Sequence, residues 1–180
     1  MFDVELGEAV DFEGRLASLW WDAHSIPEHD EVDFRAELAN LVPPAPGVYA
    51  VTGRHDGGSG IRVLYIGQAT DLSARMSTSA YESLSERHAN GQRLLRSDVW
   101  DLTIRWARVS AALLNHVERL LIMSHSPPFN SQEVMRSEPA ADEEHLIIMN
   151  AGRKGPLIPI VAGAYQATWR DRRGRPLGPY

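Results

Sequence analysis

The segment from residue 43 to residue 66 constrains the fold of this chain most strongly. It opens with Pro43-Pro44-Ala45-Pro46, which stiffens the backbone and is incompatible with a helix. Two short runs rich in β-forming residues follow, at 47–52 and 61–66, and a linker with four glycines joins them. Runs of this composition around a glycine-rich linker are typical of antiparallel strands connected by a turn. The segment therefore predicts a β-hairpin that begins at a boundary in the chain.

Periodicity predicts the elements on either side of this hairpin. Apolar residues at helical spacing indicate helices at 13–23, 33–41, 72–76, 81–97 and 110–123, and Asp71 is a candidate N-cap for the third of these. Apolar runs typical of strands occur at 102–107, 146–149, 157–161 and 165–169. This order predicts an α/β (α+β) fold, with an acidic helical extension at 1–45, a core at 46–132 and a C-terminal extension at 133–180 that packs on the core.

Composition narrows the cellular setting and the class of partner. The 180 residues contain no cysteine and no long apolar run, and the N-terminus is acidic, so we expect a cytoplasmic protein without disulfides or a membrane-spanning helix. The net charge of −6 is unevenly distributed, because residues 1–46 carry −9, residues 47–132 carry +2 and residues 133–180 carry +1. The mildly basic middle segment permits a nucleic-acid partner without requiring one.

Five short motifs follow one another along the middle segment. Gly47-Val48-Tyr49 opens the first predicted strand, and Tyr65-Ile66-Gly67 closes the second. Arg75 comes eight residues after Gly67, Glu118 lies in the helix predicted at 110–123, and Pro127-Pro128-Phe129-Asn130 follows that helix. In this order and spacing, over about residues 46–132, the motifs resemble those of the GIY-YIG nuclease family.

The resemblance implies a GIY-YIG nuclease core, which is a small mixed sheet flanked by helices. It also implies a restriction-like or mobile-element-like endonuclease that hydrolyses phosphodiester bonds with Mg²⁺ or Mn²⁺, in DNA rather than in RNA. Such an enzyme must stabilise the negative charge that develops on the phosphoryl group in the transition state. Glu118 is then the metal ligand, and Arg75 offers a permanently charged fork to phosphate oxygens.

Site residues are implied in the same way. The resemblance assigns catalytic roles to Tyr49, Tyr65, Arg75, His88, Glu118 and Asn130, and substrate contacts to Gly67, Gln68 and Arg75. A phenol titrates near pH 10, so Tyr49 or Tyr65 can act as a general base only where a cation lowers its pKa. The sequence does not distinguish the two tyrosines, and either one can instead orient the attacking water. Asn130 is expected to orient the local backbone or Tyr49.

Two positions depart from the family pattern. Many members have a lysine directly after the second motif, where this chain has Gln68, and a histidine or tyrosine four residues after the arginine, where it has Ser79. These departures support a second hypothesis, a nucleic-acid-binding module that has the fold but is catalytically weak. The net acidity supports a third, a nuclease-fold enzyme that acts on a substrate other than nucleic acid.

Three further features concern charged segments. The acidic N-terminal segment is expected to face away from a nucleic-acid groove or to fold over it as an inhibitory lid, because carboxylates repel phosphates within the screening length. Near the C-terminus, we expect five residues to contact the backbone of the nucleic acid, namely Trp169, Arg170, Arg172, Arg173 and Arg175. Gly152-Arg153-Lys154-Gly155 is not a P-loop, because the Gly-Lys-Ser/Thr ending is missing.

Overall fold

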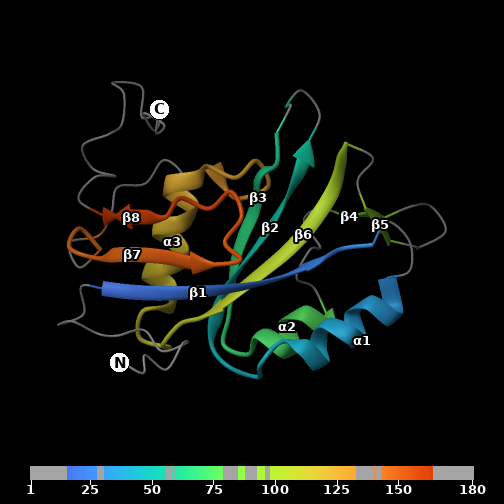
Figure 1. Cartoon of the computed structure of the whole chain (residues 1–180), viewed down its shortest axis with the longest axis horizontal. Helices are drawn as coiled ribbons and strands as arrows, with labels where there is room; N and C mark the ends of the chain where they lie inside the picture. Colours follow the sequence, from blue (N-terminus) through green and yellow to red (C-terminus); the bar gives the residue numbers. More distant parts are fainter. Residues whose placement is uncertain are drawn as a thin grey trace.

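The computed structural model describes residues 16–27, 31–55, 58, 60–78, 85–87, 93–95, 98–132, 140 and 143–163. Within these residues, six strands form one curled sheet in the order β3-β2-β6-β1-β7-β8, and two short strands form a separate pair (Figure 1). The elements in chain order are β1 (Leu16–Ser25), α1 (Glu31–Leu41), β2 (Gly47–His55), β3 (Arg62–Ala69), α2 (Leu72–Thr78), β4 (Ser85–Arg87), β5 (Arg93–Leu95), β6 (Val99–Arg108), α3 (Leu114–His125), β7 (Ile147–Gly152) and β8 (Ile160–Ala162). The general α+β class is therefore correct.

The predicted hairpin is present and forms one end of the sheet. β2 and β3 pair antiparallel, with Gly47 opposite Ala69 and Tyr49 opposite Gly67, and the register shifts once between Val51 and Thr52. On its other side β2 pairs antiparallel with β6, so β3 is an edge strand. The strand predicted at 102–107 and the helices predicted at 33–41, 72–76 and 110–123 are likewise confirmed as β6, α1, α2 and α3.

The helix predicted at 13–23 is wrong, because residues Leu16–Ser25 form strand β1. Its first part pairs parallel with β7, from Leu16 to Trp21, and its second part pairs antiparallel with β6, from Asp22 to Ser25. Ala17, Leu19 and Trp21 are buried at every second position, which is the period of a strand. The same segment also has apolar residues at helical spacing, and partners far away in the sequence decide between the two structures.

The helix predicted over 81–97 is also wrong in its described parts. Ser85–Arg87 and Arg93–Leu95 are β4 and β5, which pair antiparallel with each other. Short segments of mixed polarity do not distinguish helix from strand by periodicity alone. In the tail, β7 and β8 correspond to the strands predicted at 146–149 and 157–161, whereas 165–169 lies outside the described residues.

Two apolar clusters hold the helices on opposite faces of the sheet. On one face, α3 packs through buried residues such as Val117 and Leu121 against Trp21 and Val48. On the other face, α1 and α2 pack with Tyr49 and the neighbouring core residues, and the α1 and α2 members of this cluster are Phe34, Leu38, Leu72 and Met76. The edge strand β3 therefore lies between α2 and α3.

The curl of the sheet is visible in the strand directions. β1, β7 and β8 run at a large angle to β2, β3 and β6, and β1 connects the two groups (Figure 1). None of the helices in the described part of the chain is long and apolar enough to cross a lipid bilayer.

Candidate active site at the edge strand

Tyr49 of β2 and Tyr65 of β3 lie side by side on the face that α2 covers. Their ring centroids are 6.0 Å apart and the ring planes are inclined at 42°. Tyr49 is only 2% exposed, whereas Tyr65 is half-buried. Burial raises the pKa of Tyr49 well above its usual value near 10, and its interaction with Tyr65, including a hydrogen bond, raises that pKa further. Tyr49 therefore remains protonated at neutral pH, and Tyr65 is the phenol that reaches solvent.

The two motif glycines occupy positions where no side chain fits. Gly67 lies opposite Tyr49 in the hairpin, and a Cβ atom on Gly67 would be 2.5 Å from Cζ of the Tyr49 ring. A Cβ atom on Gly47 would be 2.4 Å from both the carbonyl oxygen of Ala107 and Cδ1 of Leu72. Gly67 thus allows the Tyr49 ring to lie against β3, and Gly47 allows the start of α2 to approach β2.

Arg75 reaches this pair of phenols from α2. The helix begins after Asp71, whose Oδ1 accepts a hydrogen bond of 2.9 Å from the backbone N–H of Ala74, so the predicted cap is confirmed. Leu72 and Met76 are buried and fix the helix on the sheet, which leaves Arg75 exposed. The positive charge of Arg75 acts on the Tyr49 phenol and partly offsets the rise in its pKa.

Glu118 approaches the same strand from α3, on the opposite face of the sheet. It is half-buried, and burial raises its pKa from 4.5 to about 7. Hydrogen bonds from the backbone and side chain of Gln68 and the charge of Arg75 act in the opposite direction. The Glu118 carboxylate in turn contributes to the raised pKa of Tyr49. The phenols, the guanidinium and the carboxylate therefore lie within electrostatic reach of one another around β3.

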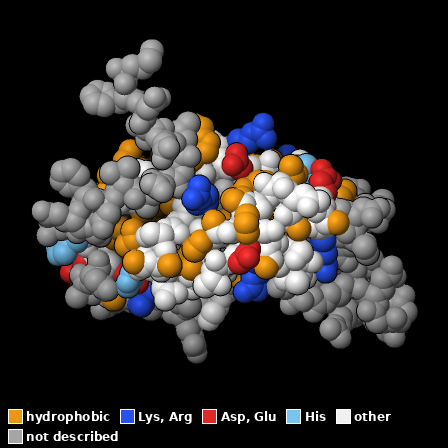
Figure 2. Space-filling view, turned by 90° about the horizontal axis from the view of Figure 1, so that it is seen from below, with side chains coloured by type: hydrophobic (Ala, Val, Ile, Leu, Met, Phe, Trp, Pro, Cys, Tyr) orange, Lys and Arg blue, Asp and Glu red, His pale blue; other side chains and the backbone are white. Residues whose placement is uncertain are grey.

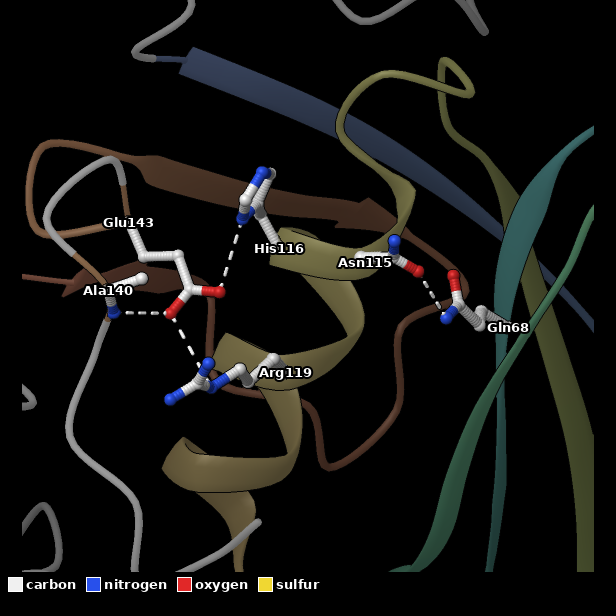
Figure 3. A network of polar contacts seen from close by, with 6 residues as sticks. All are labelled: Gln68, Asn115, His116, Arg119, Ala140 and Glu143. Atoms are coloured by element: carbon white, nitrogen blue, oxygen red, sulfur yellow. Dashed lines mark hydrogen bonds and ion pairs between the residues drawn. The ribbon is translucent and has the colours of Figure 1, made fainter.

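Gln68 connects β3 to the helix that carries Glu118. Its Nε2 donates a hydrogen bond of 2.6 Å to Oδ1 of Asn115 (Figure 3). Its Oε1 is buried and has no hydrogen-bond partner among the residues that the structure describes. Asn115 and Glu118 are three residues apart and so share one side of α3. An unsatisfied buried acceptor beside a half-buried carboxylate is unusual, because such an atom normally finds a donor.

A second group of contacts holds α3 from its other side. Glu143 is 2% exposed, and its Oε1 lies 3.2 Å from Nδ1 of His116. Its Oε2 lies 3.6 Å from Nε of Arg119 and accepts a hydrogen bond of 2.8 Å from the backbone N–H of Ala140. Figure 3 shows His116 and Arg119 turned toward Glu143, whereas Asn115 is turned toward Gln68. The helix is thus fixed in rotation, which determines where Glu118 lies.

Asn130 fixes the backbone of the second motif. Its Oδ1 accepts a hydrogen bond of 2.8 Å from the backbone N–H of Ile66, and its Nδ2 donates one of 2.7 Å to the Ile66 carbonyl oxygen. The backbone N–H of Phe129 donates to the carbonyl oxygen of Leu64 at 3.1 Å. The segment after α3 therefore pairs with the outer edge of β3, between Tyr65 and Gly67, and Asn130 orients backbone.

The structure brings most of the expected site residues together, from β2, β3, α2, α3 and the segment that follows α3. His88 and Ser79 lie outside the described residues. The sequence interpretation missed Asn115, although its position three residues before Glu118 was a usable signal, because such residues share a helix face. It also gave no reason to separate Tyr49 from Tyr65, since their different burial depends on tertiary packing.

The side chains around β3 offer few ligands for a divalent metal ion. Within the described ranges, no group of three His, Cys, Asp or Glu side chains gathers in a way that could hold a metal. Of the described residues named in this cluster, Glu118 is the one that offers a carboxylate. Mg²⁺ commonly binds through one or two carboxylates plus substrate phosphates and keeps several of its waters. A single half-buried carboxylate near the Arg75 guanidinium is compatible with that mode of binding.

Comparison of the chain with protein-family models, with curated proteins and with solved structures finds no match in any of the three. The case for a function therefore depends on the motif residues and on their geometry.

Proposed function

We propose that this chain is a metal-dependent endonuclease of the GIY-YIG type that hydrolyses phosphodiester bonds in nucleic acid, DNA in preference to RNA, in the cytoplasm. The observation that carries the proposal is the arrangement around β3. Tyr49, Tyr65, Arg75 and Glu118 come from four elements and influence one another electrostatically at one edge strand.

Each charged group has a distinct part in this proposal. Arg75, exposed beside the phenols, binds two non-bridging oxygens of the scissile phosphate and stabilises the charge that develops on them. Glu118 would hold one Mg²⁺ or Mn²⁺, which when bound supplies Lewis-acid polarisation of the phosphate and its leaving oxygen. Gln68, itself held by its hydrogen bond to Asn115, positions the Glu118 carboxylate through hydrogen bonds from its backbone and side chain.

The two tyrosines differ in the part that we assign to them. Tyr49 has a raised pKa and is almost fully buried, which makes it a poor general base at neutral pH. Tyr65 is half-buried and next to it, so we assign the orientation of the attacking water to Tyr65. Tyr49 then positions Tyr65 through their hydrogen bond and ring contact. Asn130 maintains the strand geometry on which both depend.

A second candidate function is a nucleic-acid-binding module with weak catalysis. The observation that favours it is the raised pKa of Glu118, because a carboxyl that titrates at about 7 is partly protonated under physiological conditions and binds a cation less tightly. Gln68 stands where many family members have a lysine, and a neutral amide cannot supply the missing positive charge.

The deciding experiment is cleavage of a supercoiled plasmid by the purified chain with Mg²⁺, with Mn²⁺ and with EDTA. The test variant is Glu118→Gln, and the matched control is Glu144→Gln, an exposed acid outside the cluster. Metal-dependent cleavage should fall by on the order of 100-fold or more in Glu118→Gln, since metal stabilisation of the transition state is worth several kcal/mol. The control should cleave like the wild type.

Thermal unfolding separates the chemistry from the fold. Glu118→Gln should unfold at the wild-type temperature or slightly above it, because the amide removes a charge that burial disfavours. Arg75→Lys should also reduce cleavage, because an ammonium cannot replace the planar fork. Full activity in Glu118→Gln would exclude the metal assignment, and retention of the plasmid without cleavage by the wild type would favour the binding module.

A further inference from the structure

Three cationic residues meet where the β7–β8 connection crosses β6. Arg105 lies in β6, and Arg153 and Lys154 lie in the turn that follows β7. The turn begins and ends with left-handed glycines, Gly152 with φ 71° and Gly155 with φ 57°. The sequence interpretation excluded a P-loop at Gly152–Gly155 and left this basic turn without a role. We name Arg105, Arg153 and Lys154 the turn cations.

The side chain of Arg105 lies directly under the turn. A Cβ atom on Gly155 would be 2.4 Å from Cζ of Arg105, so the guanidinium packs against the bare Gly155 backbone. Nε of Arg105 donates to Oγ1 of the buried Thr52 at 3.1 Å, and Nη1 donates to the carbonyl oxygen of Arg153. These two bonds use two of the five N–H donors of a guanidinium.

The other two cations are also held by carbonyl groups. Nζ of Lys154 donates to the carbonyl oxygen of Leu157 at 2.8 Å, and Nη1 of Arg153 lies 3.4 Å from that of Ala23. Arg153 is exposed, whereas Arg105 and Lys154 are half-buried. The turn and β6 are therefore joined by fixed contacts that bring three positive charges to one part of the fold.

No acidic group balances these charges among the ion pairs of the described residues. None of those pairs includes a turn cation. Partial burial of a charge without a counter-charge is unfavourable, and burial lowers the pKa of Arg105 below its usual value. Three cations gathered at one turn, with no acidic partner among the described residues, thus point to an anionic ligand.

We propose that Arg105, Arg153 and Lys154 form a phosphate-binding site that holds the nucleic-acid backbone away from the reacting bond. The ligand class follows from the chemistry, because arginine forks and a lysine ammonium together match phosphate oxygens. The assignment to nucleic acid, as opposed to another phosphate, rests on the proposed function. On the face shown in Figure 2, charged side chains of the described residues are dispersed among apolar and neutral ones, with no concentrated basic area.

The turn cations lie near the C-terminal end of α3, the helix that carries Glu118. Lys154 is close enough to His125, the last residue of α3, to affect its pKa. Glu118 comes seven residues earlier in the same helix, which is roughly 10 Å along the axis at 1.5 Å per residue. Because each strand of a duplex carries a phosphate about every 3.4 Å of axis, the turn cations would meet the backbone roughly three nucleotides from the scissile bond.

The first experiment tests the anion site without any nucleic acid. Thermal unfolding is measured in inorganic phosphate and in chloride at equal ionic strength, for the full chain. The test variant is Arg153→Gln with Lys154→Gln, and the matched control is Arg35→Gln with Arg62→Gln, which removes the same charge outside the turn. Phosphate should raise the unfolding temperature of the wild type and control more than that of the test variant, because a ligand stabilises the state that binds it.

The comparison between variants removes the general stabilising effect of phosphate, which acts on all of them alike. Equal responses in the test variant and in the control would overturn the site. Arg105→Lys supplies a second variant that keeps the charge but loses the fork, and its response should be smaller than that of the wild type.

The second experiment tests the backbone assignment by binding of a labelled DNA duplex in EDTA, where no cleavage occurs. Relative to the wild type, the slope of log Kd against log salt should fall by about one to two units in the test variant, and it should fall less in the matched control, Arg35→Gln with Arg62→Gln. If the test variant lost its response to phosphate but kept the wild-type salt slope for DNA binding, the nucleic-acid assignment would be overturned. Wild type that binds with this slope but never cleaves would contradict the proposed function and leave the phosphate site standing.

Discussion

Gly67 and Tyr49 show how one backbone position shapes the candidate site. The Tyr49 ring occupies the space of a Cβ atom on Gly67, with the hydroxyl oxygen 2.6 Å from that position. Gly67→Ala should displace the ring and destabilise the fold by about 1–3 kcal/mol, the usual range for overpacking. Cleavage should fall by on the order of 100-fold, because a displacement of about 1 Å is enough for such a loss. Urea unfolding and plasmid cleavage measure the two effects.

Gly60→Ala is the matched control for Gly67→Ala. A Cβ atom on Gly60 meets nothing within 4 Å, so its stability should stay within about 0.5 kcal/mol of the wild type. If Gly67→Ala also behaved like the wild type, the close contact between Gly67 and the Tyr49 ring would not constrain the site.

Glu118 gives the proposed activity a defined pH dependence. Its pKa is about 7 in the folded chain, and only the ionised carboxylate can hold a cation. At limiting Mg²⁺ the cleavage rate should therefore rise as the pH rises through about 7. At saturating Mg²⁺ the midpoint should move to lower pH, because the cation competes with the proton. A midpoint that does not respond to the Mg²⁺ concentration would contradict metal binding by Glu118.

At the level of single residues, the sequence predicted which side chains lie together but not how deeply each of them is buried. Motif order and spacing select Tyr49, Tyr65, Arg75 and Glu118, and the structure places them together. Nothing local in the sequence shows that one phenol is buried and the other is half-exposed, since burial depends on α2 and β6. The pairing of Gln68 with Asn115 joins residues 47 positions apart and was missed for the same reason.

At the level of elements, His125 connects α3 to the β7–β8 connection. Its Nε2 accepts a hydrogen bond of 2.9 Å from the backbone N–H of Ile158, so in the neutral ring the proton is on Nδ1, 2.8 Å from the Leu121 carbonyl oxygen. Burial lowers the pKa of His125 from 6.5 to about 4. A protonated ring could not accept from Ile158, so protonation and this contact exclude each other.

This contact predicts a loss of stability in mild acid. The unfolded chain binds a proton at His125 below about pH 6.5, whereas the folded chain does so only below about pH 4. Stability is therefore unaffected above pH 6.5, falls as the pH decreases from 6.5 to 4, and is not reduced further by this residue below pH 4. The shift corresponds to a loss of about 3 kcal/mol at 1.36 kcal/mol per pKa unit.

The measurement is the free energy of unfolding in urea at a series of pH values. His125→Gln should be less stable than the wild type at pH 7 and should have a flatter profile between pH 6.5 and 4. His145→Gln replaces an exposed histidine and should keep the wild-type profile. Parallel profiles for the wild type and His125→Gln would show that His125 does not titrate as stated.

The elements that were predicted correctly are those whose signals are local. The β2–β3 hairpin follows from two runs and a glycine-rich linker, α2 from the Asp71 cap, and α3 from a strong apolar stripe. β1 was predicted as a helix because residues 16–23 satisfy both periods, and its partners lie about 80 and 130 positions away. A rule that considers only neighbouring residues does not include those partners, so the segment alone could not distinguish helix from strand.

At the level of the whole molecule, the two apolar clusters share one sheet. Leu38 of α1 belongs to the cluster on one face and Leu121 of α3 to the cluster on the other, and both are fully buried. Leu38→Ala and Leu121→Ala should each destabilise the chain by about 2–5 kcal/mol. Because both clusters include residues of β2, β3 and β6, we expect each variant to unfold in a single transition.

The test is urea unfolding followed in parallel by tryptophan fluorescence and circular dichroism. Coincident curves in both variants would support one cooperative unit. The matched control is Leu41→Ala, which truncates a leucine that is 53% exposed and should have little effect. Two separate transitions in Leu38→Ala would instead show that α1 and α2 unfold independently of the rest.

The position of β1 between β6 and β7 has a consequence for synthesis. The strand is made first, but Leu16 pairs with Ile147, which is translated 131 residues later. At about 5–20 residues per second, the ribosome needs roughly 6 to 26 s to produce that partner. Until β7 has been translated, the apolar segment with Leu19, Trp20 and Trp21 lacks that neighbour in the sheet. The sheet can therefore close only after β7 has been translated, so this apolar segment waits without its parallel partner while the intervening residues are made.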